Sequence, residues 1–230
     1  MLTLRRSEER GHAKLDWLDS RHTFSFADYH DPAHMGHRAL RVVNEDHIAP
    51  AHGFGPHPHR DMEILTYPIS GALEHRDSEG HRSVLRPGRV QLMSAGRGIV
   101  HSETNPLPDR ATHLLQIWIE TERRGLAPRY QEMDVHLDDG GPVVVASRGG
   151  RRGGLDIRQD VTVSAVRLAA GGDLELPLAA DRHAWVQVVA GSGRVARLHV
   201  AAGDGIALSE ESGLRLSTDE GIEALVFDLA

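Results

Sequence analysis

Residues 55–75, GPHPHRDMEILTYPISGALEH, combine two features that direct the interpretation of the whole chain. The second part of the stretch is rich in β-branched and aromatic residues, and Ser70-Gly71 interrupts it, which is typical of two strands joined by a tight turn. The first part places His57 and His59 two positions apart, so an extended backbone directs both imidazoles to one face. The proline between them favours that extended conformation. The stretch therefore predicts a strand that presents two histidines together.

The rest of the sequence repeats this pattern of short strands and turns. Segments 113–120 and 161–171 have the composition of strands, and 24 glycines with 11 prolines provide many turns. We expect residues 122–134 to form a polar loop, and Gly191-Ser192-Gly193 to form a turn between two strands. No long amphipathic helix is evident. The sequence predicts an all-β protein of two tandem sandwich or barrel units, with a boundary near residue 140.

Composition excludes several classes of protein. An apolar fraction of 40% and a charged fraction of 26% are ordinary for a globular chain, and the net charge of −7 argues against direct binding of nucleic acid or an anionic membrane. The sequence has no cysteine, which excludes disulfides, thiolate metal sites and cysteine nucleophiles. The N-terminal residues are charged throughout, and no apolar run approaches membrane-spanning length. We therefore expect a cytoplasmic protein.

Histidines are concentrated in the first half, where 13 of the 16 lie between His12 and His113. His101 and Glu103 form a second pair with strand spacing, and two such pairs on neighbouring strands of one barrel converge on a single point. Three imidazoles and a carboxylate suit iron, copper, nickel, manganese or zinc rather than calcium or magnesium. An octahedral ion held by these four side chains keeps positions open, which indicates catalysis rather than a structural role.

The order of these residues resembles the two motifs of the cupins. The first motif is His57-x-His59-x3-Glu63 followed by Gly71, and the second is Gly88-x5-Ser94-x-Gly96 followed by His101-x3-Asn105. Gly71 lies one residue later than usual, Ser94 replaces a common proline, and His101 lies two residues further from Gly96. With LDSRHTFSFADYHDP (18–32) and SAGRGIVHSE (94–103), these departures resemble the pirin family. The resemblance covers residues 5–135 closely, whereas the C-terminal half agrees in layout only.

This resemblance implies a bicupin, that is, two tandem β-barrel (double-stranded β-helix) domains. Residues 1–140 are expected to form a metal-binding cupin, and residues 141–230 a degenerate cupin without metal. The family's ligands fall on His57, His59, His101 and Glu103. The usual cupin glutamate, at Glu63, is not a ligand in pirins. The ion implied is Fe(II), with copper, nickel, manganese, cobalt or zinc as alternatives.

The activity implied is that of a metal-dependent quercetin 2,3-dioxygenase, which cleaves a flavonol with dioxygen and releases carbon monoxide. Glu103 is the candidate general base for the flavonol 3-hydroxyl. The first alternative is a non-enzymatic pirin-type regulator that senses metal or redox state and acts through protein partners. The second is another metal-cupin reaction, such as an isomerisation. We expect a monomer with a small aromatic substrate.

Other chemistry-bearing residues are given structural roles. Phe24 and Phe26 are expected to fill the core, and Glu63 to take part either in hydrogen bonding around the ligands or in a structural ion pair. Several histidines are assigned to turns, to the core or to a loop over the site rather than to metal: His30, His34, His37, His75, His81 and His113.

Overall fold

The computed structural model describes residues 1–138 and 141–230, which form two compact units. We call the first the histidine-rich unit; it comprises Gly11–Val135 and Ile157–Gln159. We call the second the C-terminal unit; it comprises Met1–Arg10, His136–Asp156 and Asp160–Ala230. The domain boundary predicted at residue 140 lies outside the described residues.

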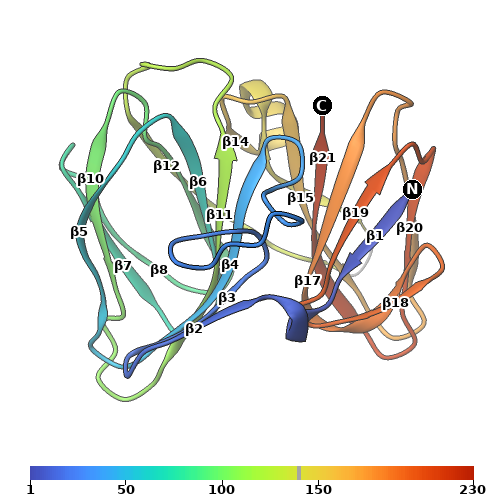
Figure 1. Cartoon of the computed structure of the whole chain (residues 1–230), viewed down its shortest axis with the longest axis horizontal. Helices are drawn as coiled ribbons and strands as arrows, with labels where there is room; N and C mark the ends of the chain where they lie inside the picture. Colours follow the sequence, from blue (N-terminus) through green and yellow to red (C-terminus); the bar gives the residue numbers. More distant parts are fainter. Residues whose placement is uncertain (139–140) are drawn as a thin grey trace. The chain divides into compact units, whose positions relative to one another are not determined.

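Two antiparallel sheets build the histidine-rich unit (Figure 1). The larger sheet has the strand order β12-β9-β6-β11-β4-β3-β2, and the smaller has the order β5-β10-β7-β8. The strands of the larger sheet are β2 (Gly11–Lys14), β3 (Leu18–His22), β4 (Leu40–Ile48), β6 (Met62–Ser70), β9 (Arg89–Ser94), β11 (Thr112–Glu120) and β12 (Arg129–Asp134). Those of the smaller are β5 (Gly53–His59), β7 (Leu73–Asp77), β8 (Arg82–Leu85) and β10 (Ile99–Thr104).

An apolar cluster joins these two sheets. Leu18, Ile48 and Leu114 come from the larger sheet, and Leu73 and Leu85 come from the smaller. All five are buried, because their side chains meet in the layer between the two sheets. This packing holds β7 and β8 of the smaller sheet against the larger sheet.

The turn predicted at Ser70-Gly71 is present between β6 and β7. Gly71 has a φ of +79°, which favours glycine, and a Cβ there would lie 2.7 Å from the carbonyl oxygen of Ala111. Glycine therefore permits both the sharp reversal and the close approach of the next segment.

Two local predictions are wrong. Residues 129–134 of the expected loop form β12, which pairs with β9 along Arg129–Asp134. Here pairing to a neighbouring strand outweighs the weak local preference of a polar segment. The expected turn at Gly191-Ser192-Gly193 lies instead within β17 (His183–Val195), which continues into a turn at Ala196, where φ is +52°.

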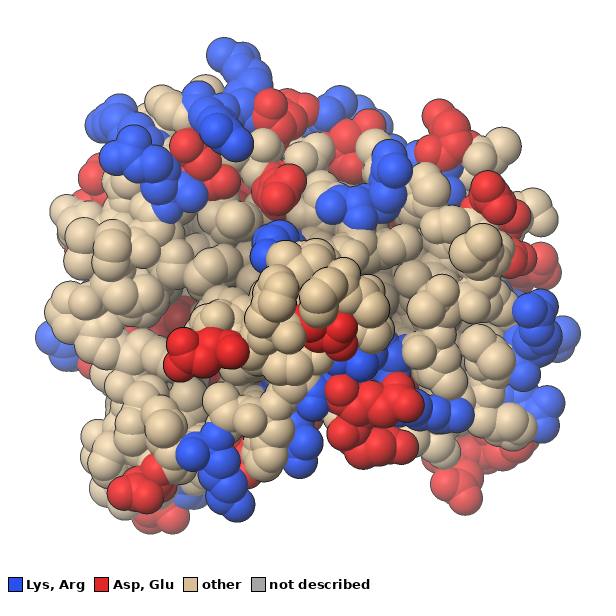
Figure 2. Space-filling view, viewed as in Figure 1, with Lys and Arg blue, Asp and Glu red and all other residues tan. Residues whose placement is uncertain are grey.

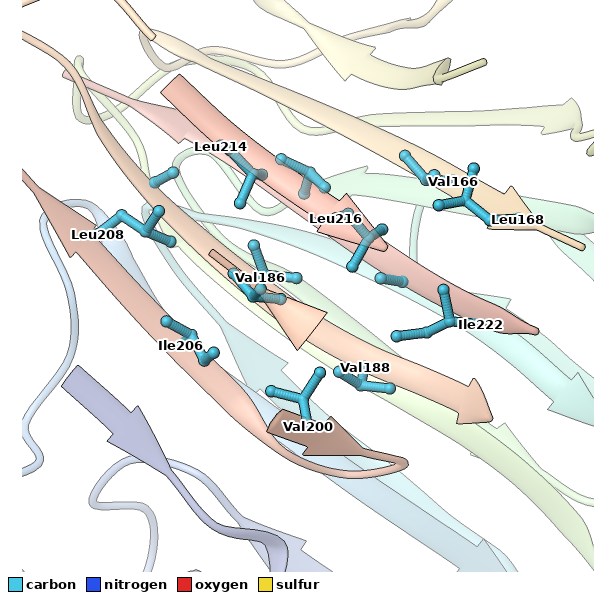
Figure 3. Close-up of a cluster of buried hydrophobic side chains, with 14 of the residues drawn as sticks. Val166, Leu168, Val186, Val188, Val200, Ile206, Leu208, Leu214, Leu216 and Ile222 are labelled. Atoms are coloured by element: carbon cyan, nitrogen blue, oxygen red, sulfur yellow. The ribbon is translucent and has the colours of Figure 1, made fainter. Parts of the chain in front are cut away.

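A second set of strands forms the C-terminal unit: β1 (Leu2–Arg5), β13 (Val143–Ser147), β14 (Leu155–Asp156), β15 (Val161–Leu168), β16 (Asp173–Pro177), β17, β18 (Leu198–Ala201), β19 (Gly205–Ser209), β20 (Gly213–Ser217) and β21 (Ile222–Leu229). The N-terminal strand β1 pairs with β19, a long-range pairing that leaves no local signal in the sequence. Figure 3 shows the core of this unit, where Val186 and Val188 of β17 pack with Ile206 of β19 and Leu216 of β20. The prediction of an all-β protein with two cupin-type domains is confirmed.

Helical structure is minor, as expected. The described residues contain the short 3₁₀ segments η1 (Ser7–Glu9) and η2 (Arg148–Gly153). Within the described part of the chain, no helix has the length and apolarity that a membrane span requires. On the face displayed in Figure 2, basic and acidic side chains are interspersed.

The cluster between the two sheets supplies a test of the packing. We expect Leu114→Ala to lower the free energy of unfolding by about 2–5 kcal/mol, because the truncation leaves a cavity between the sheets. Urea denaturation followed by circular dichroism measures the loss. The control is Val84→Ala, since Val84 is 41% exposed on β8 and its truncation creates no cavity. Equal losses in the two variants would contradict this role for the cluster.

Candidate metal centre

The antiparallel pairing of β5 with β10 assembles the predicted site. His101 lies directly opposite His57, and Ile99 lies opposite His59. The side chains of these four residues alternate with the exposed Pro58 and Val100, so the three histidines face the interior of the unit. Glu103, further along β10, is also buried. The register shifts between His101 and Glu103, where β5 contains an additional residue.

Three imidazoles meet at this point. Potential ligand atoms of His57, His59 and His101 all lie within 4.8 Å of one another. The ring centroids are 4.4 Å apart for His57 and His101, 4.7 Å for His59 and His101, and 4.8 Å for His57 and His59. Such an arrangement of nitrogens suits a divalent transition metal ion.

The hydrogen bonding of these rings fits a bound cation. His57 Nδ1 lies 2.8 Å from the carbonyl oxygen of Gly55, which only accepts, so Nδ1 carries the proton and Nε2 is left as a ligand atom. His101 Nε2 is buried and has no hydrogen-bond partner among the described residues. A buried nitrogen without a partner is costly in free energy, and a metal ion at this position removes the cost.

The electrostatic environment favours neutral imidazoles. Burial, together with the neighbouring His57, lowers the pKa of His59 to about 4. The pKa of His101 is also strongly lowered by burial and by the adjacent histidines. Metal ligation requires the unprotonated ring, so both effects prepare the site for an ion.

Glu103 is buried in a polar network next to these histidines. Its Oε1 accepts a hydrogen bond from Gln91 Nε2 at 3.0 Å, and its Oε2 accepts one from Gln116 Nε2 at 2.5 Å. Burial raises the pKa of the Glu103 carboxyl to about 7, and the charge of Asp46 acts in the same direction. The carboxylate is thus oriented by amides from two strands of the larger sheet, β9 and β11.

The structure brings Glu103 together with only part of the predicted set. Its carboxylate forms a second cluster with His75 and His101, whereas His57 and His59 cluster with His101 alone. His101 is the member that the two clusters share. The assignment of Glu103 as a fourth ligand, beside the three histidines, stays a prediction.

Sequence reasoning placed His75 among turn and core residues and missed its position at the site. His75 Nδ1 lies 3.4 Å from His101 Nδ1, and the side chain is fully buried. Because His75 lies opposite Glu103 in the β7–β10 pairing, the strand register places it on the same interior face. The sequence offered one signal, because His75 lies two positions after the apolar Leu73 and so shares its face of the strand. The sequence did not show which strand would pair with this one.

Glu63 has a structural environment. Its Oε2 accepts hydrogen bonds from Ser94 Oγ at 2.7 Å and from the backbone N–H of Arg158 at 3.3 Å. It belongs to neither of the two clusters of possible ligands found among the described residues. The generic cupin glutamate therefore serves to anchor the segment Ile157–Gln159 to the histidine-rich unit.

Two aromatic rings pack next to His59. The Trp118 ring makes an edge contact with His59 at 4.7 Å between centroids, and Phe26 packs edge-on against Trp118 at 5.3 Å. Phe24 is 3% exposed, which confirms its predicted place in the core, while Phe26 is half-buried. These rings restrict the orientation of His59 and reduce the access of water to it.

Two other histidines with assigned roles contact an acidic side chain instead of the three-histidine cluster. His113 Nε2 lies 2.9 Å from Glu45 Oε1, and its ring stacks on His47. His34 Nδ1 lies 2.8 Å from Asp31 Oδ2 in the segment before β4.

A cavity of about 810 Å³ lies in the C-terminal unit, and none of the four predicted ligands lines it.

The three-histidine cluster supplies a direct test. We expect His101→Ala to abolish stoichiometric binding of a divalent metal, because it removes the imidazole common to both clusters. Elemental analysis after anaerobic reconstitution and desalting measures the metal content. His199→Ala is the control, since His199 is an exposed histidine of the C-terminal unit. Full metal content in His101→Ala would contradict the assignment.

Comparison with known families agrees with this architecture. The family model described as Pirin matches residues 3–119, and the model described as Quercetinase C-terminal cupin domain matches residues 144–229. A protein of Escherichia coli K12 named quercetin 2,3-dioxygenase is 44% identical over 229 residues, which cover 100% of this chain and 99% of the relative. A Pseudomonas aeruginosa protein named putative quercetin 2,3-dioxygenase is 42% identical, with complete coverage of both chains.

Solved structures give the same result. The crystal structure of YhhW from Escherichia coli superimposes with a TM-score of 0.97 at 43% identity, covering 100% of this chain and 98% of that one. A nickel(II) complex of the same bacterial pirin has a TM-score of 0.96 at 43% identity, covering 100% and 99%. The fold, the cluster of histidines and the sequence similarity along the whole chain agree, and the chain belongs to the pirin family.

Proposed function

We propose that this protein is a metal-dependent dioxygenase that cleaves a flavonol of the quercetin type, with consumption of dioxygen and release of carbon monoxide. The observation that carries the proposal is the convergence of His57, His59 and His101, with the orphaned Nε2 of His101 directed to no protein group among the described residues. The names of the relatives in Escherichia coli and Pseudomonas aeruginosa support the choice of substrate class.

The proposed ligands are His57, His59, His101 and Glu103. A bound divalent ion would supply a Lewis acid that favours the oxyanion of the flavonol 3-hydroxyl and a site at which dioxygen is used. The nickel(II) complex of the related bacterial pirin supports a divalent ion in this fold. We propose Fe(II) as the native ion, as the resemblance to pirins implies, and we propose that residues 141–230 form a cupin that holds no metal.

Glu103 is proposed as the general base. One of its carboxylate oxygens would accept the proton of the 3-hydroxyl, while Gln91 and Gln116 hold the carboxylate in place through their amide groups. Trp118 and Phe26 would keep His59 oriented and limit water at the reacting centre. These roles use side chains from both sheets of the histidine-rich unit and, for Phe26, from the segment between β3 and β4.

The setting proposed is a cytoplasmic monomer that acts on a small aromatic molecule and has no direct nucleic-acid or membrane partner. The absence of cysteine and the net charge of −7 support this setting.

The test is an anaerobic preparation loaded with one metal at a time and then mixed with quercetin and oxygen. We expect the flavonol absorbance to fall while carbon monoxide is released. Glu103→Gln should lower kcat by about 10²–10⁴-fold, because it removes the base and keeps a side chain of the same shape. Metal content measured in the same samples separates loss of the base from loss of the ion. A fully occupied protein that turns over no flavonol with any metal would contradict the proposal.

A further inference from the structure

A chain of polar contacts leads from His101 to the protein surface. His101 Nδ1 lies 3.4 Å from His75 Nδ1, and His75 Nε2 lies 3.1 Å from Asp77 Oδ2. The same carboxylate oxygen is 3.0 Å from Nδ1 of His81, whose side chain is 42% exposed. The side chains of His75 and Asp77 are fully buried, so these contacts place a carboxylate in the interior of the unit.

The chemistry of the chain fixes the position of each proton. A carboxylate only accepts hydrogen bonds, so His75 Nε2 must carry a proton to donate to Asp77. Nδ1 of a neutral His75 is then an acceptor. His101 Nδ1 must therefore carry the proton that the two histidines share, and His101 Nε2 keeps its lone pair. This is the buried Nε2 that has no partner among the described residues.

The surroundings hold the chain in this arrangement. The ring of Tyr130 stacks on His75 at 4.7 Å and on His81 at 5.0 Å, so it lies against both imidazoles. Asp77 Oδ1 accepts the backbone N–H groups of Glu79 and His81, each at 3.0 Å, which fixes the carboxylate in the turn after β7. Oδ1 is thus held by the turn, Oδ2 faces His75 Nε2, and His81 Nδ1 lies within 3.1 Å of both oxygens.

We propose that Asp77 and His75 are positioning residues that set the tautomer of His101 and so present its Nε2 to the metal. The inference rests on the proposed metal site, but not on the identity of the substrate. It assigns a function to a buried carboxylate and a buried histidine that are neither ligands nor catalytic groups in the proposed reaction. By this inference the contact of His75 with His101 supports a metal ligand, and the second cluster of His75, His101 and Glu103 is not a separate ion site.

Asp77→Asn is the sharpest variant, because it preserves the shape of the side chain. Its carbonyl oxygen can still accept the two backbone N–H groups of the turn. Its NH₂ group would then donate to His75 Nε2, and His75 Nδ1 would donate to His101 Nδ1. Both hydrogen bonds are thereby reversed in direction, and the proton of the His101 ring moves to Nε2. We expect the affinity for Zn²⁺, measured by competition with a chelator, to fall about 10–100-fold. His81→Gln is the matched control, since it removes the other imidazole on Asp77 and should leave that affinity unchanged.

The second readout is the tautomer itself, in metal-free protein labelled with ¹⁵N. Long-range ¹H–¹⁵N correlation spectra distinguish protonated from unprotonated ring nitrogens. We expect a protonated Nδ1 on His101 in the wild type and in His81→Gln, and a protonated Nε2 in Asp77→Asn. A loss of packing alone would not exchange the two nitrogens.

The possible outcomes separate this inference from the proposed function. A wild-type protein with the expected tautomer and with Zn²⁺ affinity that depends on Asp77 supports the inference, even if no flavonol is turned over. A protonated His101 Nε2 in the wild type, or a His75 ring protonated at both nitrogens, overturns it even if the enzyme is active. Unchanged tautomer and Zn²⁺ affinity in Asp77→Asn would also overturn it.

Discussion

The antiparallel register between β5 and β10 is the constraint on which the candidate site depends. It places His57 opposite His101, and the alternation of side chains then directs His59 to the same interior face. A slip of β5 by one residue would turn His57 and His59 away from His101, because side chains alternate along a strand with a period of two. The additional residue of β5 near Gly55 brings a backbone carbonyl against His57 Nδ1 and so selects the ligating nitrogen.

Part of the interior of the histidine-rich unit is polar, and several buried polar groups there are paired with one another. Buried charges and amides are costly unless they are paired, and here Glu103 is held by Gln91 and Gln116 while Asp77 is held by His75 and a turn. The C-terminal unit shows the contrasting solution, since its central cluster consists of aliphatic side chains from its strands (Figure 3). Two cupin-type domains of one chain therefore use their interiors differently.

Much of this arrangement was predictable from the residues. The strand-forming stretch from Ile64 to His75, the turn at Gly71 and the two pairs with strand spacing are local features, and each is present in the structure. The loop expected at residues 122–134 was wrong over residues 129–134, because β12 forms there by pairing with β9. That pairing places Tyr130 against His75, a contact between residues far apart in sequence.

The sequence by itself determined the all-β architecture, the pirin resemblance and the candidate ligands His57, His59, His101 and Glu103, because strand periodicity and motif spacing are properties of the chain. Only the tertiary structure decided which of these side chains meet. It placed the three imidazoles in one cluster and Glu103 in another with His75. It also revealed the buried contact from His101 through His75 to Asp77, because hydrogen bonds across strands depend on register and packing that no local pattern specifies.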